Sequence, residues 1–90
     1  MRQSSTELSQ RIESNGSVWH VRVVGRERAD GTWEGRLEFR DGDSPPVTTG
    51  EETSQPNLQA LEYWATGLEP VYLEGALERA TRAVSGTRRD

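Results

Sequence analysis

The sequence contains neither cysteine nor lysine, and each absence excludes a kind of chemistry. Without cysteine, no disulfide can stabilise a small fold, and the Cys/His spacings typical of zinc sites cannot occur. All eleven basic residues are arginine, so no lysine side chain can form a Schiff base or act as an amine nucleophile. The chain must therefore depend on the burial of apolar side chains for its stability.

Large apolar residues are also scarce. Leu, Ile, Val and Phe together account for sixteen of the ninety residues, and most of them lie between Val18 and Val84 with all the Trp and Tyr residues. A core of this size typically supplies only about 3–5 kcal/mol of net stability, and homodimerisation would add to it. We predict a single α+β domain over residues 18–86, with a flexible N-terminal arm at 1–17 and a disordered tail at 87–90.

The chain also lacks long apolar runs. None approaches the roughly 18 residues that a membrane span needs, and the first residues do not resemble a signal segment. The net charge of −4 is modest. We therefore expect a cytoplasmic protein, of bacterial style, that does not enter a membrane.

Apolar and polar residues alternate along two segments within residues 18–40, and this period of two predicts two half-buried strands. The apolar positions are Trp19, Val21, Val23, Trp33, Leu37 and Phe39.

Parity fixes the length of the turn between these strands. A two-residue turn at Asp30-Gly31 would place apolar residues beside charged ones. A three-residue loop at residues 29–31, with Gly31 in the left-handed region, puts Val21 opposite Phe39 on the buried side. On the solvent-exposed side of the hairpin, arginines of the first strand then lie opposite glutamates of the second, which favours this register.

The same register places two glycines, Gly25 and Gly35, opposite each other on the buried face. Facing glycines indicate the close approach of a bulky group, such as a helix or a tryptophan ring. We expect the C-terminal helix to pack there through its small residues Ala76 and Ala83.

The remaining elements complete a small antiparallel sheet of three strands covered on one face by helices. A short strand near residues 47–50 is predicted beside the second strand. Asn57 is expected to cap a short helix at about 58–66, and a C-terminal helix is expected at about 70–85. Its apolar stripe comprises Leu73, Leu77, Ala80 and Val84. Residues 6–13, with Leu8 and Ile12 four apart, contain too few apolar residues for more than a marginal helix.

Charge is segregated along the chain, and this suggests a binding surface. Residues 41–69 carry six acidic residues and no basic one, together with Tyr63 and Trp64. Aromatic side chains anchor interfaces and charge steers a partner of opposite sign. We therefore predict a non-enzymatic module that docks another protein, or a second copy of itself, through this segment or a sheet edge. The predicted partner-binding residues are Glu51, Glu52, Tyr63 and Trp64. The competing interpretation is that Trp64 belongs to the core and the acidic residues to a solvated loop.

Two alternatives remain open. The first is a small-ligand or enzymatic site between the helices and the sheet, which would use Tyr63, Trp64, Tyr72 and the carboxylates and hydroxyls of residues 51–54. The second is nucleic-acid binding by the arginine side of the hairpin, which contains Arg22, Arg26, Arg36 and Arg40. Glutamates interrupt this arginine side and the protein is acidic, so we do not expect a nucleic-acid partner.

The sequence predicts no catalytic residue, cofactor or metal. The one histidine, His20, falls on the wet side of its strand near Arg40, without the carboxylate and nucleophile that a catalytic histidine needs. Asp41-Gly42-Asp43 resembles the start of a calcium loop, but Pro45 and Pro46 end the match.

Overall fold

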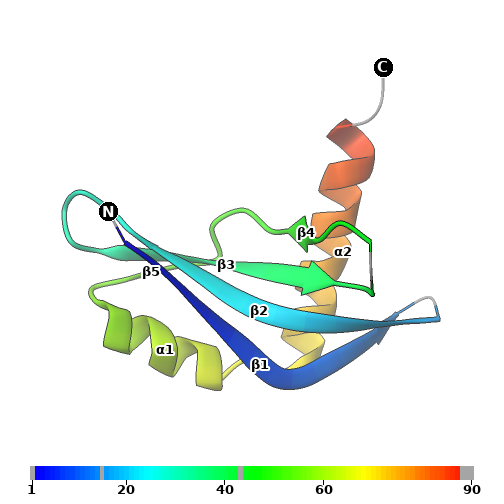
Figure 1. Cartoon of the computed structure of the whole chain (residues 1–90), viewed down its shortest axis with the longest axis horizontal. Helices are drawn as coiled ribbons and strands as arrows, with labels where there is room; N and C mark the ends of the chain where they lie inside the picture. The colour runs from blue at the N-terminus through cyan, green and yellow to red at the C-terminus, as the bar shows by residue number, and fades with distance from the viewer. Residues whose placement is uncertain (1, 15, 43, 88–90) are drawn as a thin grey trace.

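The computed structural model describes residues 2–14, 16–42 and 44–87, without the side chains of residues 9, 10 and 83–87. The described residues form a five-stranded antiparallel sheet with two helices, which confirms the α+β class (Figure 1). The elements in chain order are β1 (Gln3–Ser14), β2 (Ser17–Glu27), β3 (Trp33–Arg40), β4 (Val47–Thr48), β5 (Thr53–Gln55), α1 (Leu58–Thr66) and α2 (Pro70–Thr87).

The β2–β3 hairpin has the predicted register. Val21 pairs with Phe39 on the buried side, and His20 pairs with Arg40 on the exposed side. The loop contains three residues, because the Arg28 amide donates to the Thr32 carbonyl at 2.7 Å. Gly31 adopts a φ of 89°, as the closing position of this loop requires.

The N-terminal segment corrects a prediction. Residues 3–14 form strand β1, paired antiparallel with β2, so the marginal helix considered at residues 6–13 is wrong. The spacing of four between Leu8 and Ile12 suits a strand as well as a helix, and Ile12 is buried opposite Trp19. The predicted arm thus contains a strand that belongs to the sheet. The predicted tail lies, apart from Thr87, outside the described residues.

The predicted third strand is present but interrupted. β4 pairs with one end of β3 and β5 with the other, so the sheet has two more strands than the three predicted. Thr49 bridges the interruption: its hydroxyl accepts a hydrogen bond from the Leu37 amide at 3.0 Å and donates to the Gly50 carbonyl at 2.8 Å. The buried hydroxyl thus replaces a ladder bond that the irregular backbone cannot supply.

The helices begin where the sequence predicts. The Asn57 side chain caps α1 by accepting a hydrogen bond from the Ala60 amide at 2.8 Å, and Pro70 opens α2. Leu73, Leu77 and Ala80 of α2 are buried as predicted, whereas the side chain of Val84 lies outside the described part.

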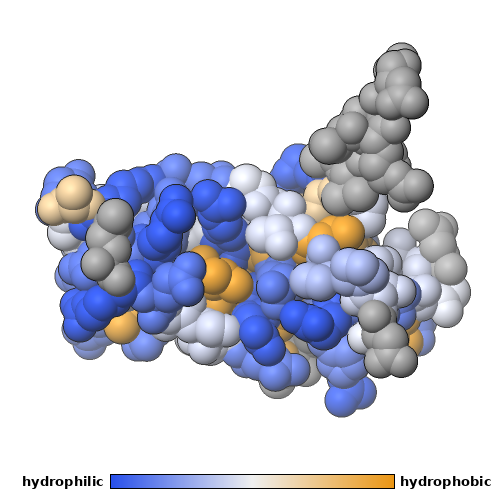
Figure 2. Space-filling view, turned by 45° about the horizontal axis from the view of Figure 1, so that its top comes forward, coloured by the Kyte–Doolittle hydropathy of each residue, from blue (hydrophilic) through white to orange (hydrophobic). Residues whose placement is uncertain are grey.

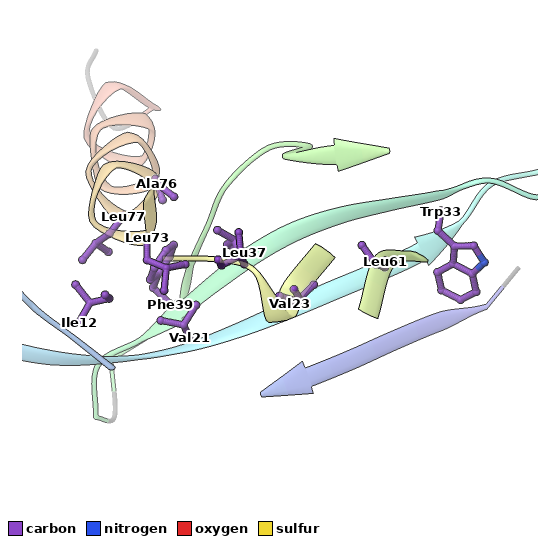
Figure 3. Packing of buried hydrophobic residues seen from close by; sticks show 13 residues of the cluster. Ile12, Val21, Val23, Trp33, Leu37, Phe39, Leu61, Leu73, Ala76 and Leu77 are labelled. Atoms are coloured by element: carbon purple, nitrogen blue, oxygen red, sulfur yellow. The ribbon is translucent and has the colours of Figure 1, made fainter. Parts of the chain in front are cut away.

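The two helices cover different ends of the inner face of the sheet. α1 contacts β2, β3 and β5, whereas α2 contacts β1 and β4. Figure 3 shows Leu61 of α1 at the end of the core that contains Trp33, and Leu73 of α2 beside Phe39 at the other end. In Figure 1 the C-terminal half of α2 extends beyond the sheet.

The glycine pair Gly25 and Gly35 accommodates α1, not α2. A Cβ atom on Gly25 would collide with Cδ2 of Leu61, and one on Gly35 would lie 2.7 Å from Cδ1 of the same leucine. The prediction that Ala76 packs there is therefore wrong, and the side chain of Ala83 lies outside the described residues. Because only two residues separate α1 from β5, which ends opposite Trp33, the chain brings α1 to this end of the sheet first.

We predict that Gly35→Ala lowers the free energy of unfolding by about 1–3 kcal/mol, because the new methyl group overpacks the contact with Leu61. Gly50→Ala is the matched control, since nothing lies within 4 Å of a Cβ atom there, and it should change stability by less than about 0.5 kcal/mol. Urea unfolding measures both. Adding Leu61→Ala to Gly35→Ala should give a loss smaller than the sum of the two single losses, and strict additivity would contradict the contact.

Candidate functional site

Helix α1 carries two apolar stripes, although only one can face the sheet. Leu61 and Ala65 are buried against the strands. Ala60, Tyr63, Trp64 and Gly67 follow the spacing i, i+3, i+4, i+7, so they share a second face of the helix. The sheet covers this second face only in part, because Trp64 packs against the core whereas Tyr63 is exposed, and the face lines a groove.

The groove, which we call the aromatic groove, lies between α1 and the start of α2 and has a volume of about 860 Å³. Tyr63 projects into solvent at its edge with 80% of its surface exposed, whereas Trp64 is half-buried and packs against the core. The residues that line it are Gln55, Ala60, Tyr63, Trp64, Thr66, Gly67, Leu68, Glu69 and Tyr72.

Tyr72, one wall of the groove, is held from behind by two charged residues. Its hydroxyl donates a hydrogen bond to Glu52, whose side chain is only 9% exposed. Arg79 donates to the same carboxylate at 2.8 Å and lies 5.9 Å from the centre of the Tyr72 ring. Burial, and then the adjacent Glu52 carboxylate, raise the pKa of Tyr72 above its usual value. The loop between β4 and β5 therefore fixes a side chain of the groove.

The four predicted partner-binding residues separate into two pairs. Tyr63 and Trp64 line the aromatic groove together. Glu51 and Glu52 instead form ion pairs within the chain: Glu51 lies 2.6 Å from Arg28, and Glu52 pairs with Arg79. These two carboxylates are therefore not a free acidic surface.

The acidic groups left at the groove were not singled out from the sequence. Glu69 lines it, and Glu62 is exposed on α1 beside Tyr63 in sequence. Neither carboxylate takes part in an ion pair among the residues that the structure describes. The second stripe of α1, which includes Ala60, was the sequence signal that would have located the groove.

The predicted arginine side is the outer face of the sheet, opposite the helices. Each of its four predicted arginines lies within 4 Å of a glutamate: Arg26 and Arg36 beside Glu34, and Arg22 and Arg40 beside Glu38. Arg26 and Arg36 are thus hydrogen-bonded to Glu34, whereas Arg22 and Arg40 share Glu38 at 3.7 and 3.6 Å. On the side of the molecule that Figure 2 shows, hydrophilic residues dominate the surface and apolar residues form separate spots.

Glu34 is the best-enclosed carboxylate of the outer face, with a side chain that is 9% exposed. Arg36 donates to it at 3.0 Å, Arg26 at 3.2 Å and Arg28 at 3.4 Å. The hydrogen bond from Arg36 outweighs the effect of burial, so the pKa of Glu34 lies below its usual value. This network joins β2 and β3 on the side that no helix covers.

Two further findings concern the chemistry that the described residues allow. In the described ranges, His, Asp and Glu side chains do not gather in a group of three that could hold a metal ion. None of the helices in the described part combines the length and the apolar character needed to cross a membrane.

Comparisons of the chain with protein-family models, with curated proteins and with solved structures found no match.

We predict that Tyr72 titrates above the ordinary tyrosine value of about 10. The neutral phenol is favoured in the folded state, so its contribution to stability is complete below the unfolded pKa and is lost as pH rises through the folded pKa. Ultraviolet absorbance of the phenolate, taken as the difference between the wild type and Tyr72→Phe, isolates this group. A difference curve centred at the ordinary value would contradict the burial and hydrogen bond described above.

We predict that Glu34→Gln lowers the free energy of unfolding by about 1–2 kcal/mol at neutral pH, because charged hydrogen bonds are lost and the guanidinium groups repel each other. Glu38→Gln is the matched control: its ion pairs are 3.6 and 3.7 Å long, and less than about 1 kcal/mol should be lost. The Glu34 pKa is depressed, so its contribution is present above the unfolded pKa and is lost as pH falls through the folded pKa. Urea unfolding should therefore show the free energies of unfolding of the wild type and Glu34→Gln converging as pH falls from neutral to acidic. Equal losses in both variants would contradict the central place of Glu34.

Proposed function

We propose that the chain is a small, non-enzymatic, cytoplasmic module of bacterial style that binds a segment of another protein in its aromatic groove. One observation supports this most directly: Tyr63 is 80% exposed at the edge of a groove whose lining also includes Trp64 and Tyr72. Tyrosine and tryptophan are enriched among the residues that carry binding energy, because they bury a large rigid area on contact. An exposed ring beside a concave surface suits an anchor of a partner.

Charge defines the partner more closely. Glu69 lines the groove and Glu62 is exposed nearby, without a counter-ion among the described residues, and no arginine is among the lining residues. Uncompensated carboxylates at a rim steer and orient a basic partner. We therefore propose a partner segment that combines an apolar or aromatic anchor with arginine or lysine.

The sheet edge is a weaker candidate for the same function. β1 is the outermost strand of the order, but its register with β2 shifts between Glu7 and Arg11. A bulge and charged side chains on an edge strand are features that discourage pairing with another chain. Self-association through this edge is accordingly not the version that we propose.

The alternative function that the groove supports is a small-ligand site. The groove is concave, and the Tyr72 hydroxyl, Gln55 and Glu69 contribute polar groups to its lining. Its volume falls in the range typical of ligand sites. The peptide is preferred because Tyr63, the most exposed aromatic residue described, lies at the open edge, where a small ligand would leave it uncovered.

The test is selection from a random peptide library displayed on phage, followed by affinity measurement with a labelled enriched peptide. We expect enriched peptides with an apolar or aromatic anchor and basic residues. Tyr63→Ala should weaken the enriched peptide at least about tenfold, equivalent to about 1.4 kcal/mol, without loss of stability. Glu69→Gln should weaken it less and reduce the dependence of the association rate on salt.

Val71→Ala is the matched control, because Val71 is 72% exposed on α2 but does not line the groove. It should leave the affinity unchanged. If no peptide is enriched, or if the enriched peptides bind Tyr63→Ala as tightly as the wild type, the proposal is wrong.

A further inference from the structure

The outer face of the sheet is organised in rows of side chains that run across the strands. In one row, Glu7 of β1 faces Arg22 of β2, which faces Glu38 of β3. In another, Arg26 of β2 faces Glu34 of β3. Opposite charges directly across strands are the arrangement that stabilises a sheet, and both rows follow it.

One row breaks this pattern. Arg11 of β1 faces His20 of β2, and His20 faces Arg40 of β3, so no carboxylate stands in the row. All three side chains are exposed. We call these three residues the cation row, after the two arginines on either side of the histidine. The row presents guanidinium and imidazole donors without a carboxylate of its own to accept them.

The counter-ions near the cation row do not saturate it. Arg40 lies 3.6 Å and Arg22 lies 3.7 Å from the same oxygen of Glu38, so one carboxylate is shared between two guanidinium groups at more than hydrogen-bond length. Arg11 has no ion pair among the described residues, although Glu13 lies two residues along the same strand. By contrast, Arg36 binds Glu34, which is also two residues away, at 3.0 Å. Guanidinium N–H donors in the cation row are therefore left without a hydrogen-bond acceptor among the described residues.

We infer that the cation row is a binding site for one phosphate group, either inorganic phosphate or the phosphoryl group of a small ligand. The guanidinium group presents its donors in a planar fork that suits phosphate oxygens, and an imidazole N–H adds a donor between the two forks. Strands lie about 4.8 Å apart, so Arg11 and Arg40 are about 10 Å apart at the backbone, a span that two long arginine side chains can close around one phosphate. This site is separate from the aromatic groove and does not depend on the proposed function.

The same geometry favours a single phosphate over a polynucleotide. A nucleic-acid backbone needs a series of uncompensated cations, and Arg26 and Arg36 of this face are hydrogen-bonded to Glu34. Glu7 and Glu38 border the row in the next rank and repel an anion, so we expect only weak affinity.

The test titrates the full chain with inorganic phosphate at constant ionic strength, with chloride as the balancing anion. Nuclear magnetic resonance follows the side-chain N–H signals of Arg11 and Arg40 and the ring signals of His20. We expect saturable shifts with a Kd of about 1–10 mM. Arg11→Gln and Arg40→Gln should each weaken binding at least about threefold, since each removes one guanidinium fork.

Arg82→Gln is the matched control, because Arg82 is an exposed arginine on α2, paired with Glu78 at 3.0 Å and remote from the outer face in sequence and element. It should leave the Kd unchanged. Shifts that fail to saturate, or a Kd that is equal in all three variants, would overturn the inference.

A second arm separates phosphate from nucleic acid. A single-stranded oligonucleotide of about ten nucleotides should bind no more tightly per phosphate than the free anion. Markedly tighter binding, with shifts that spread to Arg26 and Arg36, would overturn the single-phosphate site in favour of a nucleic-acid interface.

Discussion

The contact of Leu61 with the facing glycines Gly25 and Gly35 is the constraint on which the rest of the structure depends. Two missing Cβ atoms let α1 approach the sheet closely enough to bury Leu61 almost completely. That approach fixes the rotation of a helix that is only nine residues long and could not fold alone. Once Leu61 and Ala65 face the strands, Tyr63 must face away from them.

The aromatic groove follows from how the two helices divide the sheet. α1 covers the end near Trp33 and α2 covers the end near Phe39, so the connection between them crosses open surface. An exposed apolar helix face of this kind favours binding to a partner or aggregation. The ion-paired Glu52 accepts a hydrogen bond from Tyr72 and so holds this wall of the groove from behind.

Much of the fold could be predicted from local patterns, and the errors have physical causes. The β2–β3 register follows from parity, which links apolar faces and opposite charges in one arrangement. Strand β1 was missed because a spacing of four residues suits two periodicities. The Asn-Gly dipeptide at positions 15–16 of the sequence was the hairpin signal that would have identified it. In the structure Ser14 pairs with Ser17, and Gly16 has a φ of 81°. β5 carries no apolar residue, so its sequence contains no strand pattern to detect.

The candidate site was predictable in its aromatic residues but not in its charges. Tyr63 and Trp64 stand out in any reading of residues 41–69, because rings in an acidic segment are few. The roles of Glu51 and Glu52 depend instead on Arg28 and Arg79, which come from a distant hairpin and a later helix. Charge segregation along a sequence is therefore a poor guide to charge on a surface, since folding brings the oppositely charged segments together. The charged side chains that remain without an ion-pair partner can be identified only from the folded structure.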